Sequence, residues 1–121
     1  MAKILIIEDD PDIGRLIGLK LKSDGYDLAF AADAVTALTI ARKEDPDLIV
    51  LDLTLPGGSG LVIMERLKSI ANLAMKPVIV VTAQEPAQAE ASAREAGAVD
   101  YFQKPLDFDA LSDAIARELA D

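Results

Sequence analysis

The 121-residue chain contains no histidine, no cysteine and no tryptophan. Without cysteine it has no disulfide, no thiolate nucleophile and no thiolate-ligated metal. Without histidine it has no histidine general base, no histidine-containing catalytic triad and no histidine-ligated zinc. Any chemistry must therefore depend on carboxylates, hydroxyls, lysine or a hard metal ion.

Long apolar runs are missing as well, and positive charge is scarce. No stretch approaches the ~18–20 continuous apolar residues of a membrane span, and the first apolar run, residues 4–7, is too short for a secretion signal. The net charge of −9 disfavours non-specific nucleic-acid binding and is compatible with cations and basic protein partners. We expect a soluble, cytoplasmic protein with no direct contact to nucleic acid or membrane.

Short apolar strands alternate with helical patterns along the chain. This alternation predicts five βα units, a parallel sheet and helices on both of its faces, which is a doubly wound α/β fold. The length fits one domain, which we expect to span residues 1–121. Strands are predicted at 3–7, 27–31, 48–51, 77–81 and 100–102, and helices at 12–23, 34–43, 60–69, 87–96 and 108–120.

Residues that begin and end helices agree with this pattern. Asp10 before Pro11 is typical of an N-cap followed by proline at the first helical position. Gly25 and Gly97 follow helices where a left-handed C-terminal residue is expected.

Five polar side chains follow the predicted strands at their carboxyl ends. They are Glu8, Asp9, Asp52, Thr82 and Lys104. Because the carboxyl ends of parallel strands meet at one edge, and neighbouring strands lie about 4.8 Å apart, these side chains are expected to gather. Read singly, most have simpler explanations as loop acids, turn residues or a solvated lysine. A carboxylate that ends a fully apolar strand, as Asp52 does, needs a partner.

The expected cluster has the composition of a phosphoryl-transfer site. Two unit charges 4 Å apart repel by about 4 kcal/mol at an effective dielectric near 20, and a divalent cation would relieve this repulsion. Oxygen-only ligands suit Mg²⁺ best. With the cation and Lys104 stabilising charge and Thr82 donating a hydroxyl, Asp52 would attack phosphorus and become an acyl phosphate.

These residues and their order resemble the receiver domain of two-component response regulators, a stand-alone receiver of the chemotaxis type in particular. The resemblance covers essentially the whole chain and implies the flavodoxin-like strand order 2-1-3-4-5. Its segments are ILIIEDD at 4–10, DLIVLDL at 47–53, LPGGSG at 55–60, PVIVVTA at 77–83, GA at 97–98 and DYFQKP at 100–105.

The resemblance assigns the chemical roles by position. Asp52 resembles the phospho-acceptor, and Glu8 and Asp9 resemble the acidic pair that holds Mg²⁺, with Mn²⁺ as an alternative ion. The backbone carbonyl of Thr54 resembles the third protein ligand besides Asp9 and Asp52. Lys104 resembles the lysine that holds the phosphoryl group, before a cis peptide bond to proline.

The same resemblance implies a switch. Thr82 resembles the hydroxyl that moves to the phosphoryl group, Ala83 the small residue that leaves room for it, and Tyr101 the aromatic residue that turns inward. Thr54 and Gln84 occupy the two variable positions that adjust how fast the acyl phosphate hydrolyses. Tyr101 also has a simpler interpretation, as an edge-strand aromatic that covers a helix.

The implied function is acceptance of a phosphoryl group from a sensor histidine kinase or a histidine phosphotransfer protein, not enzymatic turnover beyond the protein's own phosphorylation and dephosphorylation. The surface of the fourth helix, fifth strand and fifth helix would then control a downstream effector. Receivers of the winged-helix transcription-factor class dimerise there through basic residues of the fifth helix. This chain has Ala114 and Asp121 at the expected outward positions, with Arg117 between them, so we expect a monomer or weak dimer.

Two other functions stay open at this point. A binding module that works without phosphorylation would usually lack an acidic or lysine position, and none is lost here. A phosphatase or transferase of the haloacid-dehalogenase type needs a second aspartate where Thr54 stands, and the turn at 8–11 has no glycine fingerprint for a nucleotide.

Overall fold

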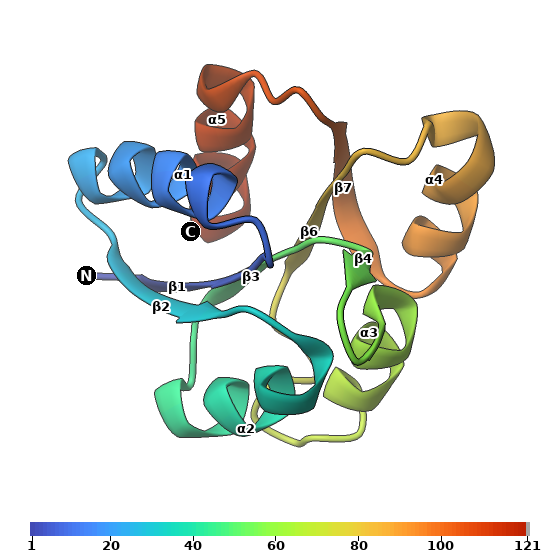
Figure 1. The fold of residues 1–121 in the computed structure, drawn as a ribbon. Helices are drawn as coiled ribbons and strands as arrows, with labels where there is room; N and C mark the ends of the chain where they lie inside the picture. The colour runs from blue at the N-terminus through green and yellow to red at the C-terminus, as the bar shows by residue number, and fades with distance from the viewer. Residues whose placement is uncertain (121) are drawn as a thin grey trace.

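The alternating pattern folds into a five-stranded parallel sheet with helices on both faces (Figure 1). The structure is a computed structural model, and it describes residues 1–120. The strand order is β2-β1-β3-β6-β7, which is the expected order 2-1-3-4-5 once a separate hairpin is left out of the count. The doubly wound α/β prediction is therefore confirmed.

The helices and strands follow the predicted order. The strands of the main sheet are β1 (Lys3–Ile7), β2 (Asp27–Ala31), β3 (Leu48–Leu51), β6 (Val78–Thr82) and β7 (Ala98–Gln103). The helices are α1 (Pro11–Ser23), α2 (Ala34–Glu44), α3 (Gly60–Leu67), α4 (Pro86–Glu95) and α5 (Phe108–Leu119). The hairpin consists of β4 (Thr54–Leu55) and β5 (Gly58–Ser59).

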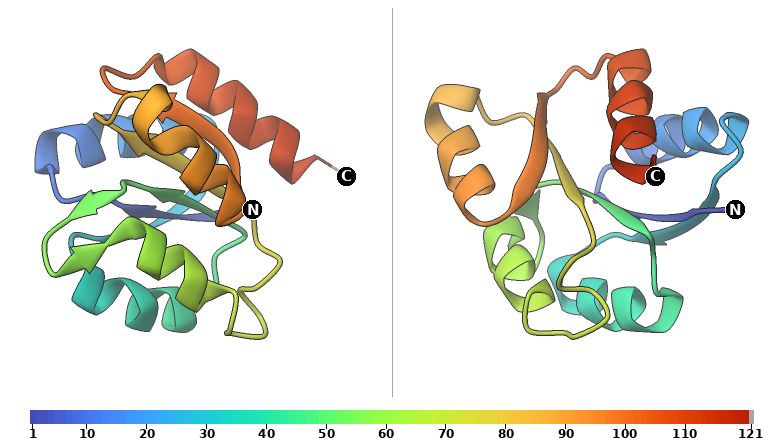
Figure 2. Two further views of the ribbon diagram at one scale, coloured as in Figure 1. Left: turned by 90° about the vertical axis from the view of Figure 1, so that its right-hand side faces the viewer. Right: turned by 180° about the vertical axis from the view of Figure 1, so that it is seen from behind.

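Two apolar cores lie on opposite faces of the sheet. Ile4 and Ile6 of β1 pack with α1 and α5, whereas Leu5 and Ile7 pack with α2, α3 and α4. Figure 2 shows α1 beside α5 and α2 beside α3 on the other side of the strands. Because successive strand side chains point to opposite faces, a strand covered on both faces must be apolar throughout. Each fully buried aliphatic side chain contributes about 1.5–3 kcal/mol to this arrangement.

The helix ends follow the expected chemistry in most places. The Asp10 carboxylate caps α1 by accepting from the backbone N–H groups of Asp12 and Ile13 at 2.9 and 3.3 Å. Gly25 and Gly97 have φ angles of 98° and 113°, in the left-handed region, as predicted.

Three features differ from the sequence-based expectation. Helix α3 ends at Leu67 rather than residue 69, since the backbone N–H and the hydroxyl of Ser69 both donate to the Arg66 carbonyl and turn the chain. Strand β7 is longer than expected, beginning at Ala98. The β4–β5 hairpin was not predicted, because strands of two residues have no periodicity to detect.

The expectation for α5 was wrong at one residue. Ala114 was expected on the outward face, but it is buried in the core that α5 forms with α1. Arg117 is exposed and lies 3.7 Å from the Asp100 carboxylate of β7. Asp121 lies outside the described residues.

Gly60 is a tightly enclosed position directly behind the carboxyl end of β3. A Cβ atom there would lie 2.6 Å from Leu53 Cα and 2.7 Å from the Asp52 carbonyl oxygen, both of them backbone atoms. We expect Gly60→Ala to lower the free energy of unfolding by about 1–3 kcal/mol, the usual cost of overpacking.

A second glycine serves as a matched control in urea denaturation. Gly14 lies inside α1, and a Cβ atom there would meet only Glu8 Cγ at 3.9 Å. Because alanine is the better helix former, Gly14→Ala should be neutral or stabilise by up to ~1 kcal/mol. If both variants changed the free energy of unfolding equally, the close backbone contacts around Gly60 would not be the cause of the loss.

Candidate functional site

The acidic cluster lies where β1 and β3 end side by side. Ile7 pairs with Leu51, and the Asp52 backbone N–H donates to the Ile7 carbonyl at 3.0 Å, so the residues that follow each strand are neighbours. Carboxylate oxygens of Glu8, Asp9 and Asp52 lie within 4.8 Å of one another. Glu8 and Asp52 are buried, whereas Asp9 is exposed. The predicted gathering of these three carboxylates is therefore present.

Lys104 reaches the cluster from the far edge of the sheet. It follows β7, and its backbone N–H donates to the Thr82 carbonyl at 2.8 Å. Its ammonium lies 2.9 Å from Asp52 Oδ2 and 2.6 Å from Glu8 Oε1, so that one cation bridges two buried carboxylates. The Lys104–Pro105 peptide bond is cis, as the resemblance implied.

Burial and charge act against each other in this group. Burial raises the pKa of Glu8, and the nearby Asp52 carboxylate raises it further, although the Lys104 ammonium and a hydrogen bond from the Asp10 backbone oppose the shift. Burial alone would lower the pKa of Lys104, but the Glu8 and Asp52 carboxylates outweigh it and raise the pKa. The cluster thus carries more negative charge than Lys104 neutralises.

The buried carboxylates of Glu8 and Asp52 receive few hydrogen bonds. Asp52 Oδ1 accepts from the Thr54 backbone N–H at 3.0 Å, and Glu8 Oε2 accepts from the Asp10 backbone N–H at 3.2 Å. Glu8 Oε1 is close to Lys104, but the contact is not aligned as a hydrogen bond. Among residues 1–120 it is the only buried side-chain oxygen or nitrogen without a hydrogen-bond partner.

A second set of contacts is built around Gln84, just beyond β6. Its backbone N–H donates to Thr82 Oγ1 at 3.3 Å, and its side-chain amide donates to Thr54 Oγ1 at 3.0 Å. The backbone carbonyl of Gln84 accepts a hydrogen bond from the Tyr101 hydroxyl at 2.7 Å. Four residues expected to act as switch or modulating positions are therefore joined by hydrogen bonds, and Ala83 is exposed between two of them.

The two expected switch residues, Thr82 and Tyr101, are both buried. Thr82 is fully buried on β6, and no hydrogen bond within residues 1–120 joins it to Asp52. Tyr101 is buried in the core near α4 while its hydroxyl bonds to Gln84, so it has both a packing contact and a polar contact. Burial raises the pKa of its hydroxyl, and the Glu90 charge adds to this.

The contacts of the Thr54 and Gln84 side chains were missed by sequence reasoning. It named both positions but did not connect them, because 30 positions separate them and no local pattern links them. The donation from Thr54 to Asp52 was missed too, although an aspartate followed two residues later by a free N–H is a common local turn.

The parallel sheet, the acidic cluster at its carboxyl edge and the bridging lysine define the receiver class of signalling domain. The family model of the response regulator receiver domain matches residues 4–116. The chain belongs to this family, which is a signalling domain of two-component systems rather than a conventional enzyme.

Individual relatives agree with this assignment. The chain is 37% identical over 117 residues to sporulation initiation phosphotransferase F of Bacillus subtilis, covering 97% of this chain and 93% of that protein. It is 39% identical over 107 residues to the DNA-binding dual master transcriptional regulator RpaA of Synechocystis, covering 88% of this chain but only 44% of that protein. It is 25% identical to the chemotaxis protein CheY4 of Vibrio cholerae with a TM-score of 0.91, covering 98% of this chain and 99% of that one.

The chain thus spans nearly all of one curated relative and less than half of another. Within residues 1–120 no helix is both long and apolar enough to cross a membrane.

Proposed function

We propose that Asp52 accepts a phosphoryl group from the phosphohistidine of a sensor histidine kinase or a histidine phosphotransfer protein. The observation that carries this proposal is the Lys104 ammonium, which lies within 3 Å of two buried carboxylates at the carboxyl edge of the sheet. We also propose that residues 1–121 form a single receiver domain.

A magnesium ion fits the residues that are present. The donor set consists of carboxylate oxygens, with one oxygen of Glu8 lacking a hydrogen-bond donor. Asp9 and Asp52 would hold the ion together with the Thr54 carbonyl, and Glu8 would hold it largely through water, because Mg²⁺ keeps several waters of hydration. When bound, the ion would offset the carboxylate charge and that of the incoming phosphoryl group, and Mn²⁺ could replace it.

The side chains of the chain itself would carry the transfer. An Asp52 carboxylate oxygen forms a bond to phosphorus as the bond from phosphorus to the donor imidazole nitrogen breaks. The donor imidazole nitrogen keeps the electron pair of the broken bond and takes up a proton, so the products are an acyl phosphate on Asp52 and a neutral histidine. The Lys104 ammonium would pass from the carboxylates to a phosphoryl oxygen and stabilise the charge that this oxygen carries.

The Gln84 contacts support a switch at Thr82. A hydroxyl can accept and donate at the same time, so Thr82 Oγ1 could keep the Gln84 N–H while its own proton is donated to the phosphoryl group. Any shift of the Gln84 backbone changes the carbonyl that holds Tyr101. We infer that the surface of α4, β7 and α5 moves between two states and so controls a downstream effector.

The phosphotransferase name of the Bacillus subtilis relative supports a partner that carries phosphohistidine, whereas the RpaA name describes DNA binding by a protein more than twice as long as the matched part. For this chain we propose no direct contact to nucleic acid or membrane, a location in the cytoplasm, and a monomer or weak dimer.

Incubation with Mg²⁺ and a small phosphodonor tests the proposal. Intact-protein mass spectrometry should show the gain of one phosphoryl group, and EDTA should prevent it. A protein that gains no mass while remaining folded would contradict phosphoryl acceptance. Continuous hydrolysis of an added phosphoester, with no phosphorylated protein accumulating, would instead favour an enzyme.

The bond between Gln84 and Thr54 should slow loss of the phosphoryl group. Because it ties the loop after β6 to the loop after β3, it narrows the path of water to Asp52. We expect Gln84→Ala and Thr54→Val each to shorten the lifetime of the phosphorylated protein several-fold. The double variant should have the same phosphoryl lifetime as either single variant, since each single substitution already removes the bond. Gln88→Ala, on the exposed surface of α4, is the control, and an equal effect there would argue against the bond.

A further inference from the structure

The outer edge of β2 is open. β2 is the terminal strand of the sheet, and among the described residues no strand pairs with its outer side. The Asp27 N–H donates to Ala2, and the Ala31 carbonyl accepts from Glu8, so these alternate residues face β1. The backbone groups of Leu28 and Phe30 therefore point outward, where another strand can bind them.

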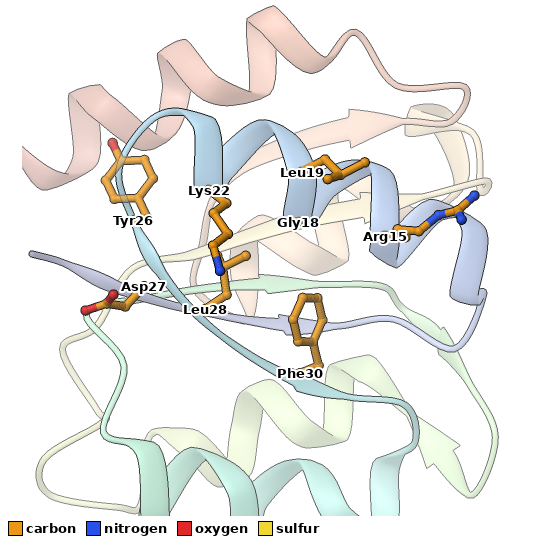
Figure 3. A pocket seen from close by; sticks show the side chains of 8 residues that line it. All are labelled: Arg15, Gly18, Leu19, Lys22, Tyr26, Asp27, Leu28 and Phe30. Carbon is orange, nitrogen blue, oxygen red and sulfur yellow. The ribbon is translucent and has the colours of Figure 1, made fainter.

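A groove of about 460 Å³ runs along this edge, between β2 and α1. Its apolar lining includes Leu19, Leu28 and Phe30, and both Leu19 and Phe30 are more than half exposed. Figure 3 shows the Phe30 ring reaching from β2 toward Gly18 on α1. A Cβ atom at Gly18 would lie 3.0 Å from the Phe30 ring, so the absence of a side chain there lets the ring pack against α1 as one wall of the groove.

The cations along the groove are available to a partner. Lys22 has no carboxylate within ion-pair distance among residues 1–120, and in Figure 3 its side chain extends over β2 beside Leu28. Arg15 lies two helical turns earlier on α1 and has only a distant, exposed contact to Asp12 at 3.9 Å. These two cations outnumber Asp27, the one acidic residue of the groove lining, so the groove is locally positive on a chain with a net charge of −9 and favours an acidic ligand.

We propose that this edge is a docking site for an extended, acidic peptide segment of a partner protein. The segment adds to the sheet beside β2 and bonds to the outward backbone groups of Leu28 and Phe30. Because alternate side chains of a strand point to the same face, the residues of the segment that face α1 include both apolar ones, which enter the groove, and acidic ones, which meet Arg15 and Lys22. Docking of this kind requires neither Mg²⁺ nor phosphorylation.

NMR of the isotope-labelled 121-residue chain, free of Mg²⁺, tests the proposal. The probe is a short capped peptide with threonine at every second position and with valine and glutamate taking turns at the positions between, so that both face the groove. The control peptide has lysine in place of glutamate. At saturation the glutamate peptide should slow hydrogen exchange of the Leu28 and Phe30 amides by at least about tenfold, because these amides become hydrogen-bonded. The lysine peptide should not slow the exchange of these amides.

Variants separate charge from shape. Arg15→Glu with Lys22→Glu should weaken binding of the glutamate peptide by at least about tenfold and allow the lysine peptide to bind. Lys43→Glu is the matched control, since Lys43 is exposed in the last turn of α2, as Lys22 is in the last turn of α1. Gly18→Leu should fill the groove and abolish binding. If this variant does not fold, the charge reversal still decides.

Three results would overturn the proposal. The first is peptide binding without protection of Leu28 and Phe30, which would indicate docking elsewhere. The second is equal binding of both peptides. The third is protection of the two amides without peptide as the protein concentration rises, which would mean that the edge pairs with a second copy of this chain.

Discussion

Asp52→Asn is expected to abolish the Mg²⁺-dependent gain of a phosphoryl group, with intact mass unchanged after prolonged exposure to the phosphodonor. An amide oxygen is a far weaker nucleophile than a carboxylate, and the variant also removes one ligand of the proposed cation. The fold should survive. Lys104 keeps its contact to Glu8, and an amide oxygen can still accept from the Thr54 N–H. Loss of one repelling buried charge should leave the free energy of unfolding equal or higher.

Asp10→Asn is the matched control for this experiment. It makes the same change of charge two residues from Glu8, at a side chain that caps α1. Asparagine caps helices about as well as aspartate, so neither stability nor phosphorylation should fall substantially. An equal mass gain in wild type and Asp52→Asn would place the acceptor elsewhere and sink the proposed function.

The fold was predictable because its cores demand a visible pattern. The run from Leu48 to Leu51 has no polar residue, since α-helices cover both faces of β3, and Pro11 after Asp10 indicates the start of α1 in sequence alone. Ala114 shows the limit of such reasoning. Its small side chain suits an exposed or a buried helix position equally, and only the packing of α5 against α1 decides between them.

The acidic edge was predictable for a similar reason, and its details were not. Parallel topology alone brings Glu8 and Asp52 together, because Glu8 directly follows β1, Asp52 directly follows β3, and these two strands are paired. The double contact of Lys104 and the bond between Gln84 and Thr54 depend on side-chain conformations of residues far apart in sequence. The packing of the Phe30 ring against α1 depends on the absence of a side chain at Gly18, which no periodicity reveals.

Lys104→Met is expected to destabilise the protein in the absence of divalent cations by up to about 3 kcal/mol, the lower end of the cost of removing one partner from a buried ion pair. Methionine preserves much of the aliphatic length, so the effect reports the lost charge. Glu8 and Asp52 would then be buried together without a counter-charge. Lys76→Met is the control, because Lys76 makes only a 3.9 Å contact to Asp47 in a pair that is far less buried than Lys104 and its partners. A loss below about 1 kcal/mol is expected there.

Mg²⁺ should recover part of the stability of Lys104→Met. A cation that binds the folded cluster and not the unfolded chain stabilises by mass action, and the unneutralised carboxylates of the variant should attract it more strongly than those of the wild type. Urea midpoints measured across a Mg²⁺ titration should therefore converge. Phosphorylation of the variant should stay strongly reduced even in saturating Mg²⁺, since the ammonium that would meet the phosphoryl oxygen is gone.

The pH dependence of the variant follows from Glu8. Its pKa is already raised by burial in the wild type, and loss of Lys104 removes the contact that opposes the shift. The folded state then binds more protons than the unfolded chain at mildly acidic pH, so stability rises as pH falls toward the unfolded pKa of Glu8 and is lost as pH rises through the folded value. The deficit of Lys104→Met should therefore be smaller in mildly acidic than in neutral buffer. If the loss in free energy of unfolding of Lys104→Met depended on neither pH nor Mg²⁺, Lys104 would stabilise the site by packing and not by charge.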